Sequence, residues 1–335
     1  MKYTESIEAS ARYKQDYATG IERLISNREK AAADIRRAYF SDICKDREKY
    51  RKDFADMLGW PLNERGGEAT PKVVSEKLSD EDGYTISRLS IEVLDGLMLT
   101  GLYFEYSDGR QRPLVVVQHG GSGTPELISG VNGSTFNYNN MLKRVFDRNV
   151  NVFAPQLLLW DAGKYEVAYD RHEVDSRLKR VGGSVAALEV YGIMRALDYF
   201  TSLSVIGNVG MVGMSYGGFY TLMTTAADER IKAAYSCSFF CDGSVFVKPD
   251  LCWKYELCRF GQAEIAALVY PRRLFLQMGD SDELFDSKKS KVEFDRIKEL
   301  VGDDSWVKFS SYGGKHEFCK DDAYIDELTD ILKHE

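Results

Sequence analysis

One serine stands in a setting that could make it a nucleophile. Ser215 lies in the pattern Gly213-x-Ser215-x-Gly217, directly after the apolar run Val209–Val212 and directly before an apolar segment of helical character. A turn that passes sharply from a strand into a helix strains the serine backbone and exposes its hydroxyl, and glycines let neighbouring chains approach that turn. The pattern predicts that Ser215 is catalytic; the alternative is a tight glycine turn that contains a serine by chance.

A serine hydroxyl is a weak nucleophile and needs a general base, which in turn needs a group that orients it. The chain has four histidines, namely His119, His172, His316 and His334. His334 is next to the last residue, His172 lies in a charged segment, and His119 precedes two glycines, where a role in backbone geometry is expected. His316 lies after the last expected strand and before the last expected helix, the position that the base takes in chain order. We therefore predict that His316 is the base.

The orienting acid should follow a strand between the nucleophile and the base. Segment 279–282 follows the apolar run Leu274–Met278 and offers two carboxylates, Asp280 and Asp282. We favour Asp282, because it lies farther into the loop, where a side chain can reach the imidazole. Asp280 is nearer the strand end and better placed to cap the turn. The alternative is that both aspartates belong to a polar turn without a catalytic role.

Acyl transfer also needs donors that point at the developing oxyanion. The backbone N–H of Tyr216, at the start of the helix after Ser215, supplies one. The glycine-rich segment 119–123 leaves main-chain amides exposed, and we expect the second donor to be Gly121. The same segment could cradle a phosphate, but neither a P-loop Lys-Ser/Thr nor a G-x-G-x-x-G motif followed by a helix is present.

Two long connections could line or cap a pocket around the serine, since loops at the end of such a sheet usually do. They span residues 157–183 and 239–262 and are rich in aromatic side chains. About half of these aromatic residues should belong to the core. As substrate-binding candidates we select Trp160, His172, Phe240 and Trp253.

The elements that must position these residues follow from the periodicity of the sequence. Segments 73–78, 84–94 and 97–106 alternate, are rich in Val, Ile, Thr and Tyr, and are separated by Asp-Gly turns, which predicts an antiparallel meander. The next segment, Pro113–Gln118, is a continuous apolar run, typical of a strand buried on both faces of a parallel sheet.

Strands and helices then alternate to the end of the chain. The expected strands are 151–155, 207–212, 231–236, 273–278 and 305–309, and the expected helices are 138–147, 184–199, 218–227, 288–300 and 323–333. Repeated β-α-β units of this kind predict an α/β fold with a doubly wound, mostly parallel sheet and right-handed crossovers.

Length and composition indicate one large α/β domain with an appendage. The chain has 335 residues, 44% of them hydrophobic and 29% charged, as in ordinary globular proteins. Residues 1–62 form a charged segment whose apolar residues in 17–27 and 30–40 have helical spacing, so we predict a helical N-terminal arm and a main domain over 63–335. The apolar stripe of the arm should pack on the main domain or form a subunit interface.

Charge and cysteine content exclude several classes of partner. A net charge of −8 disfavours nucleic acid and anionic membrane surfaces. The first residues lack the apolar stretch of a secretory signal and no segment could span a bilayer, so a cytoplasmic location is expected. The six cysteines form no Cys-x-x-Cys pair and should be free. A zinc site at Cys237, Cys241, Cys252 and Cys258 is disfavoured by their spacing, and no metal or cofactor is expected.

From about Pro71 to its end, the sequence resembles the α/β-hydrolase superfamily, in its dienelactone-hydrolase-like and acetyl-xylan-esterase-like branch. The matching stretches are Val115–Gly121, Val152–Pro155, Val212–Gly218, Gly279–Asp282 and His316. The resemblance implies that Ser215, Asp282 and His316 are nucleophile, acid and base. The helical arm departs from the family pattern. Dienelactone as a substrate is disfavoured, because the related enzymes use a cysteine where this chain has Ser215.

The expected function is hydrolysis of a small-molecule carboxylic ester, with a short acyl group on a sugar or another compact alcohol suggested mainly by the resemblance. A homo-oligomer could form through the N-terminal helices. One alternative is a peptidase related to prolyl oligopeptidases, although 335 residues leave no room for their large propeller. Another is a binding protein without catalytic activity on a hydrolase scaffold.

Overall fold

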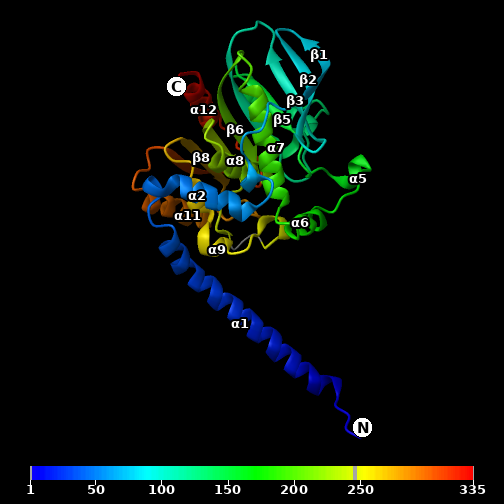
Figure 1. Cartoon of the computed structure of the whole chain (residues 1–335), viewed down its shortest axis with the longest axis vertical. Coiled ribbons are helices and arrows are strands. Elements are labelled where there is room, and N and C mark those ends of the chain that lie inside the picture. Colours follow the sequence, from blue (N-terminus) through cyan, green and yellow to red (C-terminus); the bar gives the residue numbers. More distant parts are fainter. Residues whose placement is uncertain (1, 244–246, 335) are drawn as a thin grey trace.

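A single mixed sheet forms the centre of the molecule (Figure 1). The computed structural model describes residues 2–243 and 247–334, and in these residues nine strands pair in the order β1-β2-β3-β5-β4-β6-β7-β8-β9. The strands are β1 (Val73–Glu81), β2 (Tyr84–Leu94), β3 (Leu97–Tyr106), β4 (Arg112–Gln118), β5 (Asn151–Pro155), β6 (Ile206–Met214), β7 (Ile231–Cys237), β8 (Arg273–Gly279) and β9 (Val307–Tyr312).

The first three strands form the predicted antiparallel meander, which joins the sheet where β3 pairs antiparallel with β5. The turn between β2 and β3 has Asp95 at φ 48° and Gly96 at φ 81°. Two successive residues with positive φ match the twist of the flanking strands, which explains why an Asp-Gly pair stands there.

The other six strands are parallel to one another, as their apolar runs predict. Along β4 the side chains alternate between two cores: Leu114 and Val116 lie in one, and Val115 and Val117 in the other. All four are fully buried. The sheet is therefore covered on both faces, which requires helices on each side.

Helices supply that cover and confirm the doubly wound architecture. On one face lie α2, α7 and α8, with α10 and α11 beside them, and on the other lie α4 and α12. The helices of the main body are α3 (Pro125–Ser129), α4 (Met141–Phe146), α5 (Ala162–Tyr165), α6 (Arg171–Lys179), α7 (Val185–Phe200), α8 (Tyr216–Ala227), α9 (Glu256–Arg259), α10 (Gln262–Ala267), α11 (Ser287–Val301) and α12 (Ala323–His334), and the 3-10 turns are η1 (Leu62–Glu64), η2 (Phe136–Tyr138) and η4 (Pro249–Leu251). Among residues 2–243 and 247–334, no helix is both long and apolar enough to cross a bilayer.

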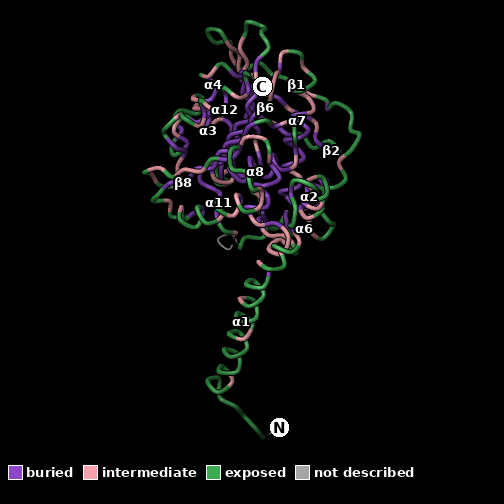
Figure 2. Tube along the Cα trace, turned by 90° about the vertical axis from the view of Figure 1, so that its left-hand side faces the viewer, coloured by how far each residue is buried: buried purple, intermediate pink, exposed green. Residues whose placement is uncertain are grey.

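The N-terminal segment contains α1 (Ile7–Tyr39) and α2 (Ile43–Leu58). The segments 17–27 and 30–40, whose spacing predicts helix, both lie in the continuous helix α1, which no proline interrupts. Most of α1 projects away from the body, as Figure 2 shows. Its last turns dock on α9, where Arg36 donates to the Leu257 carbonyl at 2.7 Å. The second helix packs fully, with Phe54 buried in the main core.

Candidate active site

Ser215 lies at the predicted turn between β6 and α8, at the carboxyl end of the parallel strands. Its backbone has φ 58° and ψ −125°, a strained conformation for a residue other than glycine. Two hydrogen bonds hold it: the Ser215 N–H donates to the Cys237 carbonyl, and the Ser215 carbonyl accepts from the Phe219 N–H, each at 2.9 Å. The surrounding structure therefore stabilises a conformation that presents the hydroxyl outward.

The glycines of the motif are explained by close approach of backbones. A Cβ at Gly213 would lie 2.2 Å from the Gly217 carbonyl oxygen, and a Cβ at Gly217 would lie 2.1 Å from the Gln118 carbonyl oxygen at the end of β4. Real Cβ atoms essentially never come this close to another atom. The spacing Gly-x-Ser-x-Gly is thus a packing requirement of the turn.

The structure brings Ser215, His316 and Asp282 together from three separate loops. The Ser215 Oγ lies 2.9 Å from His316 Nε2, and His316 Nδ1 lies 2.9 Å from Asp282 Oδ2. Asp282 Oδ1 accepts from the N–H groups of Leu284 and Phe285, at 2.9 and 3.1 Å. With the proton of the imidazole on Nδ1, Nε2 is free to accept the proton of the serine hydroxyl.

Asp280 takes no part in this arrangement. It is exposed, and its backbone N–H donates to the Tyr312 carbonyl at 2.9 Å, as an extension of the pairing between β8 and β9. The imidazole of His316 stacks on Phe285, with ring centroids 5.5 Å apart. The loop of His316 is fixed from behind, where the Asn137 side chain donates to the His316 carbonyl at 3.2 Å.

Of the two expected oxyanion donors, Tyr216 directly follows the serine and Gly121 lies near the Tyr216 ring. Tyr216 is the first residue of α8, and the first N–H groups of a helix have no partner inside the helix. Gly121 follows β4, and a Cβ placed on it would contact the Tyr216 ring at 3.5 Å. Its neighbour Gly120 is closer still, since a Cβ there would lie 3.0 Å from the Ser215 Cβ.

His119 holds this loop in place, as its position beside two glycines predicts. Its fully buried ring lies with Nδ1 3.0 Å from the Gly120 carbonyl, and Nε2 accepts from the Leu157 N–H at 3.2 Å. Burial lowers the pKa of His119 to about 4, so the ring is neutral near pH 7. A neutral ring can donate from Nδ1 and accept at Nε2 at once, which both contacts require.

A hollow of about 170 Å³ opens in front of Ser215, and we call it the Ser215 hollow. It is lined by Ser215, Tyr216, Phe239, Lys248, Leu251, Leu284 and Phe285. Pockets for drug-sized ligands usually measure roughly 300–1,000 Å³, so this space suits a small, mostly apolar group. Of its lining residues, sequence analysis had predicted contact with substrate at Ser215 and Tyr216 only. Phe239, Lys248 and Leu251 lie in the connection 239–262, which the sequence offered as a pocket lining without singling out these residues, whereas Leu284 and Phe285 follow Asp282, where no lining was predicted.

A buried ionic network lies beneath Tyr216 and was not predicted. Arg171 Nε donates to Asp250 at 2.7 Å, and its terminal nitrogens bind Glu189 on α7, one of them at 2.8 Å. The Tyr216 hydroxyl donates to the same Asp250 carboxylate at 3.1 Å. Burial alone would lower the pKa of Arg171, but the carboxylates of Glu189 and Asp250 raise it well above the ordinary value. Glu189 was the available signal, since it is the one charged residue within the run 185–194.

The four predicted substrate contacts lie elsewhere than expected. Phe240 is fully buried in the main core, so its selection is corrected: the adjacent Phe239 faces the Ser215 hollow instead. Trp253 stacks parallel to Phe219 at 6.2 Å and lines a different cavity. Trp160 lines two other surface hollows. Neither tryptophan is among the residues that line the Ser215 hollow.

His172 is half exposed and touches the ionic network rather than the Ser215 hollow. Its Nε2 lies 3.2 Å from Asp250 Oδ1, on the side of the carboxylate opposite Tyr216. The first of the two predicted loops, 157–183, carries Arg171 and His172. The second, 239–262, carries Asp250, and its residues 244–246 lie outside the described part of the chain.

All six cysteines lie in the described ranges as thiols that form no disulfide, and Cys237, Cys241 and Cys319 are buried. Burial raises the pKa of Cys237 and of Cys241 to about 11, which keeps both thiols protonated. Within the described ranges, no three His, Cys, Asp or Glu side chains are grouped so that they could hold a metal ion.

Several esterases of known structure share this fold. An acetyl xylan esterase, provisionally so named, from Bacteroides fragilis NCTC 9343 has a TM-score of 0.67 and 16% identity over 81% of this chain and 75% of its own. A glucuronoyl esterase from Solibacter usitatus has a TM-score of 0.61 and 13% identity over 86% and 91%. Acetyl xylan esterase 1 from Thermoanaerobacterium sp. JW/SL YS485 has a TM-score of 0.56 and 13% identity over 85% and 94%.

No family model matches the chain. In sequence, 122 residues are 27% identical to the Bacillus subtilis (strain 168) protein YtaP, which carries the provisional name of a hydrolase. The match covers 33% of this chain and 41% of YtaP, so the chain spans less than half the length of that relative. At these identities the comparisons concern the architecture and the order of the elements.

Proposed function

We propose that this chain, which has the α/β-hydrolase fold, is a serine carboxylesterase in which Ser215, His316 and Asp282 form the catalytic triad. The observation that carries the proposal is the hydrogen-bonded series Ser215–His316–Asp282, with both contacts at 2.9 Å, on a backbone turn strained at the serine. Such a series activates a hydroxyl that is otherwise a poor nucleophile.

The mechanism follows from the positions of the donors and acceptors. His316 Nε2 takes the proton of Ser215 as Oγ attacks the ester carbonyl carbon, and Asp282 stabilises the imidazolium. The N–H groups of Tyr216 and Gly121 bind the oxyanion of the tetrahedral intermediate. When the C–O bond to the alcohol breaks, His316 returns its proton to the leaving alkoxide. Water, activated by His316, then attacks the acyl-enzyme, and Ser215 recovers its proton as the carboxylic acid leaves.

The substrate is an ester with a short acyl group. The Ser215 hollow supports this, because its volume of about 170 Å³ is small and Phe239, Leu251, Leu284 and Phe285 make its lining largely apolar. A sugar is the alcohol we propose, since the neighbours with the same fold include proteins named acetyl xylan esterase and glucuronoyl esterase.

Ser215→Ala tests the proposal with p-nitrophenyl acetate and with acetylated sugars. We expect the variant to fold as the wild type does and to lose nearly all turnover; substantial residual activity would refute the role of Ser215. A fluorophosphonate probe should label the wild type at Ser215, and failure to label would favour the binding-protein alternative. Cleavage of Ala-Pro or Gly-Pro amides in preference to acetyl esters would favour the peptidase alternative.

We also propose that the chain self-associates through α1. Apolar residues of this helix fall on a and d positions of a heptad repeat, including Ile7, Tyr17, Ile21, Leu24, Ala31 and Ile35, whereas Ser10, Lys14 and Arg28 occupy other a and d positions. Leu24 is 67% exposed, which is costly for an apolar side chain in water. A second copy of α1 offers the same stripe, and paired helices of this period bury a and d positions against each other.

Light scattering on the full chain tests the association. We expect a dimer or a higher oligomer that the double substitution Ile21→Glu and Leu24→Glu converts to a monomer. Thr19→Glu, at an f position on the opposite side of the helix, is the matched control and should not change the mass. A monomeric wild type at high micromolar concentration would refute the proposal.

A further inference from the structure

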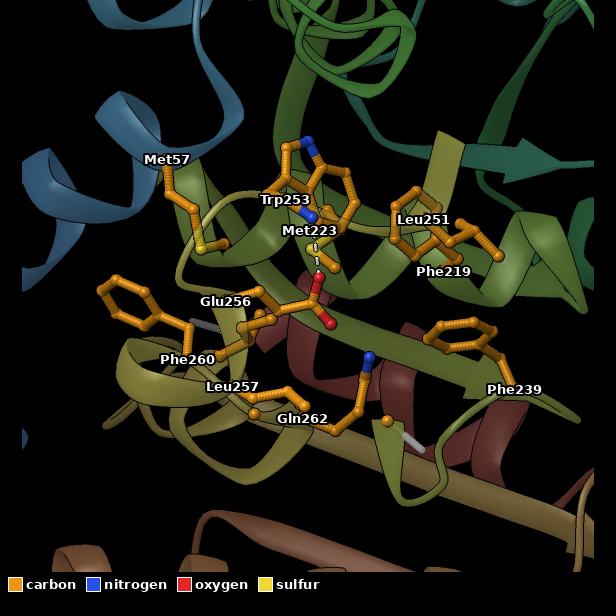
Figure 3. Close-up of a pocket in the computed structure, with 13 residues that line it drawn as sticks. Met57, Phe219, Met223, Phe239, Leu251, Trp253, Glu256, Leu257, Phe260 and Gln262 are labelled. Carbon is orange, nitrogen blue, oxygen red and sulfur yellow. Dashed lines mark hydrogen bonds between the residues drawn. The ribbon is translucent and has the colours of Figure 1, made fainter. Parts of the chain in front are cut away.

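A second, smaller space adjoins the Ser215 hollow, and we call it the inner cavity (Figure 3). Its free volume is about 20 Å³, which is room for a single water molecule. Phe239 and Leu251 lie at one side of it, and Met57 and Phe260 at the other, as Figure 3 shows. The cavity therefore extends from the neighbourhood of the nucleophile toward α2.

Two side chains line both spaces. Phe239 and Leu251 belong to the lining of the Ser215 hollow and to that of the inner cavity, and they are 3% and 6% exposed. We propose that these two residues, which we call the wall, fix the maximum length of the acyl chain. This inference rests on the proposed esterase function, because it assigns the Ser215 hollow to the acyl group.

The wall is held rigidly in place. The Phe239 ring packs edge-on against Phe219 and Phe285, with centroids 5.3 and 5.8 Å apart. Leu251 ends η4, directly after Asp250, whose carboxylate is bound by Arg171 at 2.7 Å. The buried ion pair thus fixes the backbone that carries Leu251, so the wall cannot easily move aside for a longer chain.

The space beyond the wall is suited to an apolar chain. Met57, Met223 and Leu257 line it, and methionine side chains adapt readily to new contacts. Its one carboxyl, Glu256, accepts from the Trp253 N–H at 2.8 Å. Burial raises the pKa of Glu256 to about 7, so a large fraction of this group is uncharged near neutrality. Removal of a wall side chain should therefore join two compatible spaces.

Leu251→Ala tests the wall through the ratio of kcat/KM for p-nitrophenyl hexanoate to that for p-nitrophenyl acetate. We expect the ratio to rise about tenfold or more, since a single methylene in an apolar pocket changes kcat/KM by roughly 10–200-fold. Leu251→Val, which is milder if the alanine variant unfolds, should raise the ratio in the same direction. An unchanged ratio in folded variants would overturn the inference.

Leu257→Ala is the matched control, because Leu257 lines the inner cavity but not the Ser215 hollow. Alone it should leave the ratio unchanged, and combined with Leu251→Ala it should raise the ratio further, so the two effects are not additive. Equal effects of the two single substitutions would overturn the wall.

Xenon binding separates this inference from the esterase proposal, because it needs no turnover. In crystals of Leu251→Ala under xenon pressure, we expect one continuous site that runs from Ser215 to Met57. Xenon confined to the Ser215 hollow would overturn the wall even if the esters are hydrolysed. A continuous site in a protein that hydrolyses no ester would refute the esterase function instead.

Discussion

Replacement of Arg171 by methionine should lower the free energy of unfolding by about 3–5 kcal/mol, the range for removal of one partner from a buried ion pair. Arg171 is 8% exposed, and its guanidinium binds Asp250 at 2.7 Å, Glu189 at 2.8 Å and the Leu158 carbonyl at 3.0 Å. Methionine keeps much of the volume but none of the donors. Two carboxylates would then be left in the interior without the guanidinium that binds them both.

The decrease in the free energy of unfolding should stay within that range and should not double for the two carboxylates, because each carboxylate keeps other hydrogen-bond donors. Asp250 retains the Tyr216 hydroxyl at 3.1 Å, and Glu189 retains the Leu158 N–H at 2.7 Å and the Tyr220 hydroxyl. Neutralising the carboxylates together with the arginine, as Arg171→Met with Asp250→Asn and Glu189→Gln, should recover most of the stability, since no uncompensated charge remains.

Equilibrium unfolding in urea measures the effect as a shift of the midpoint at constant m-value. Arg12→Met is the control, because Arg12 and Asp16 are 3.9 Å apart with side chains 81% and 69% exposed, and an exposed pair contributes at most about 1 kcal/mol. A loss below about 1 kcal/mol for Arg171→Met, equal to that of the control, would show that the network contributes no more than a surface pair.

Three further predictions concern single positions. Asp282→Asn should lower kcat roughly 10³–10⁴-fold in ester hydrolysis, because the imidazole loses its orienting acceptor, whereas Asp280→Asn should change kcat only a few-fold; similar losses for both would contradict the geometry. Gly217→Ala should destabilise the fold by about 1–3 kcal/mol or more in thermal unfolding, since its Cβ would lie 2.1 Å from a carbonyl oxygen, whereas Gly121→Ala meets only an ordinary contact at 3.5 Å and should keep its stability. For Glu256, burial raises the pKa from 4.5 to about 7 in the folded state, so stability is fully present below pH 4.5 and declines as the pH rises through 7. Glu256→Gln should remove about 3 kcal/mol of that decline, measured by urea unfolding at pH 4.5 and 7.5, and parallel curves for the two proteins would refute the assignment.

The sheet and the positions of the three residues of the proposed triad could be predicted because the sequence encodes both locally. Val115 and Val117 stand in an unbroken apolar run, since β4 is buried on both faces, and such runs leave few alternatives to a central strand. The order of Ser215, Asp282 and His316 follows from the order of the parallel strands, whose carboxyl ends meet at one edge of the sheet. Three residues far apart in sequence could therefore be expected at one place.

The surroundings of the serine could not be predicted in the same way. Phe239 and Phe240 are adjacent and chemically identical, yet Phe239 faces the Ser215 hollow and Phe240 is fully buried in the core. Only the path of an irregular loop decides between them. Arg171, Glu189 and Asp250 likewise come from a short helix, a long helix and a 3-10 turn, and their spacing in the sequence does not predict that they are in contact.

The projecting helix α1 has a consequence for how the molecule moves in solution. At about 1.5 Å per residue, its 33 residues span about 50 Å, whereas a compact chain of this length has a radius of gyration of only about 20 Å. A sphere with that radius of gyration is about 50 Å across, so the helix is about as long as the body is wide, and friction along it slows both translation and end-over-end tumbling. A single copy should elute from a sizing column well ahead of a sphere of equal mass, so an early elution volume alone does not indicate a dimer.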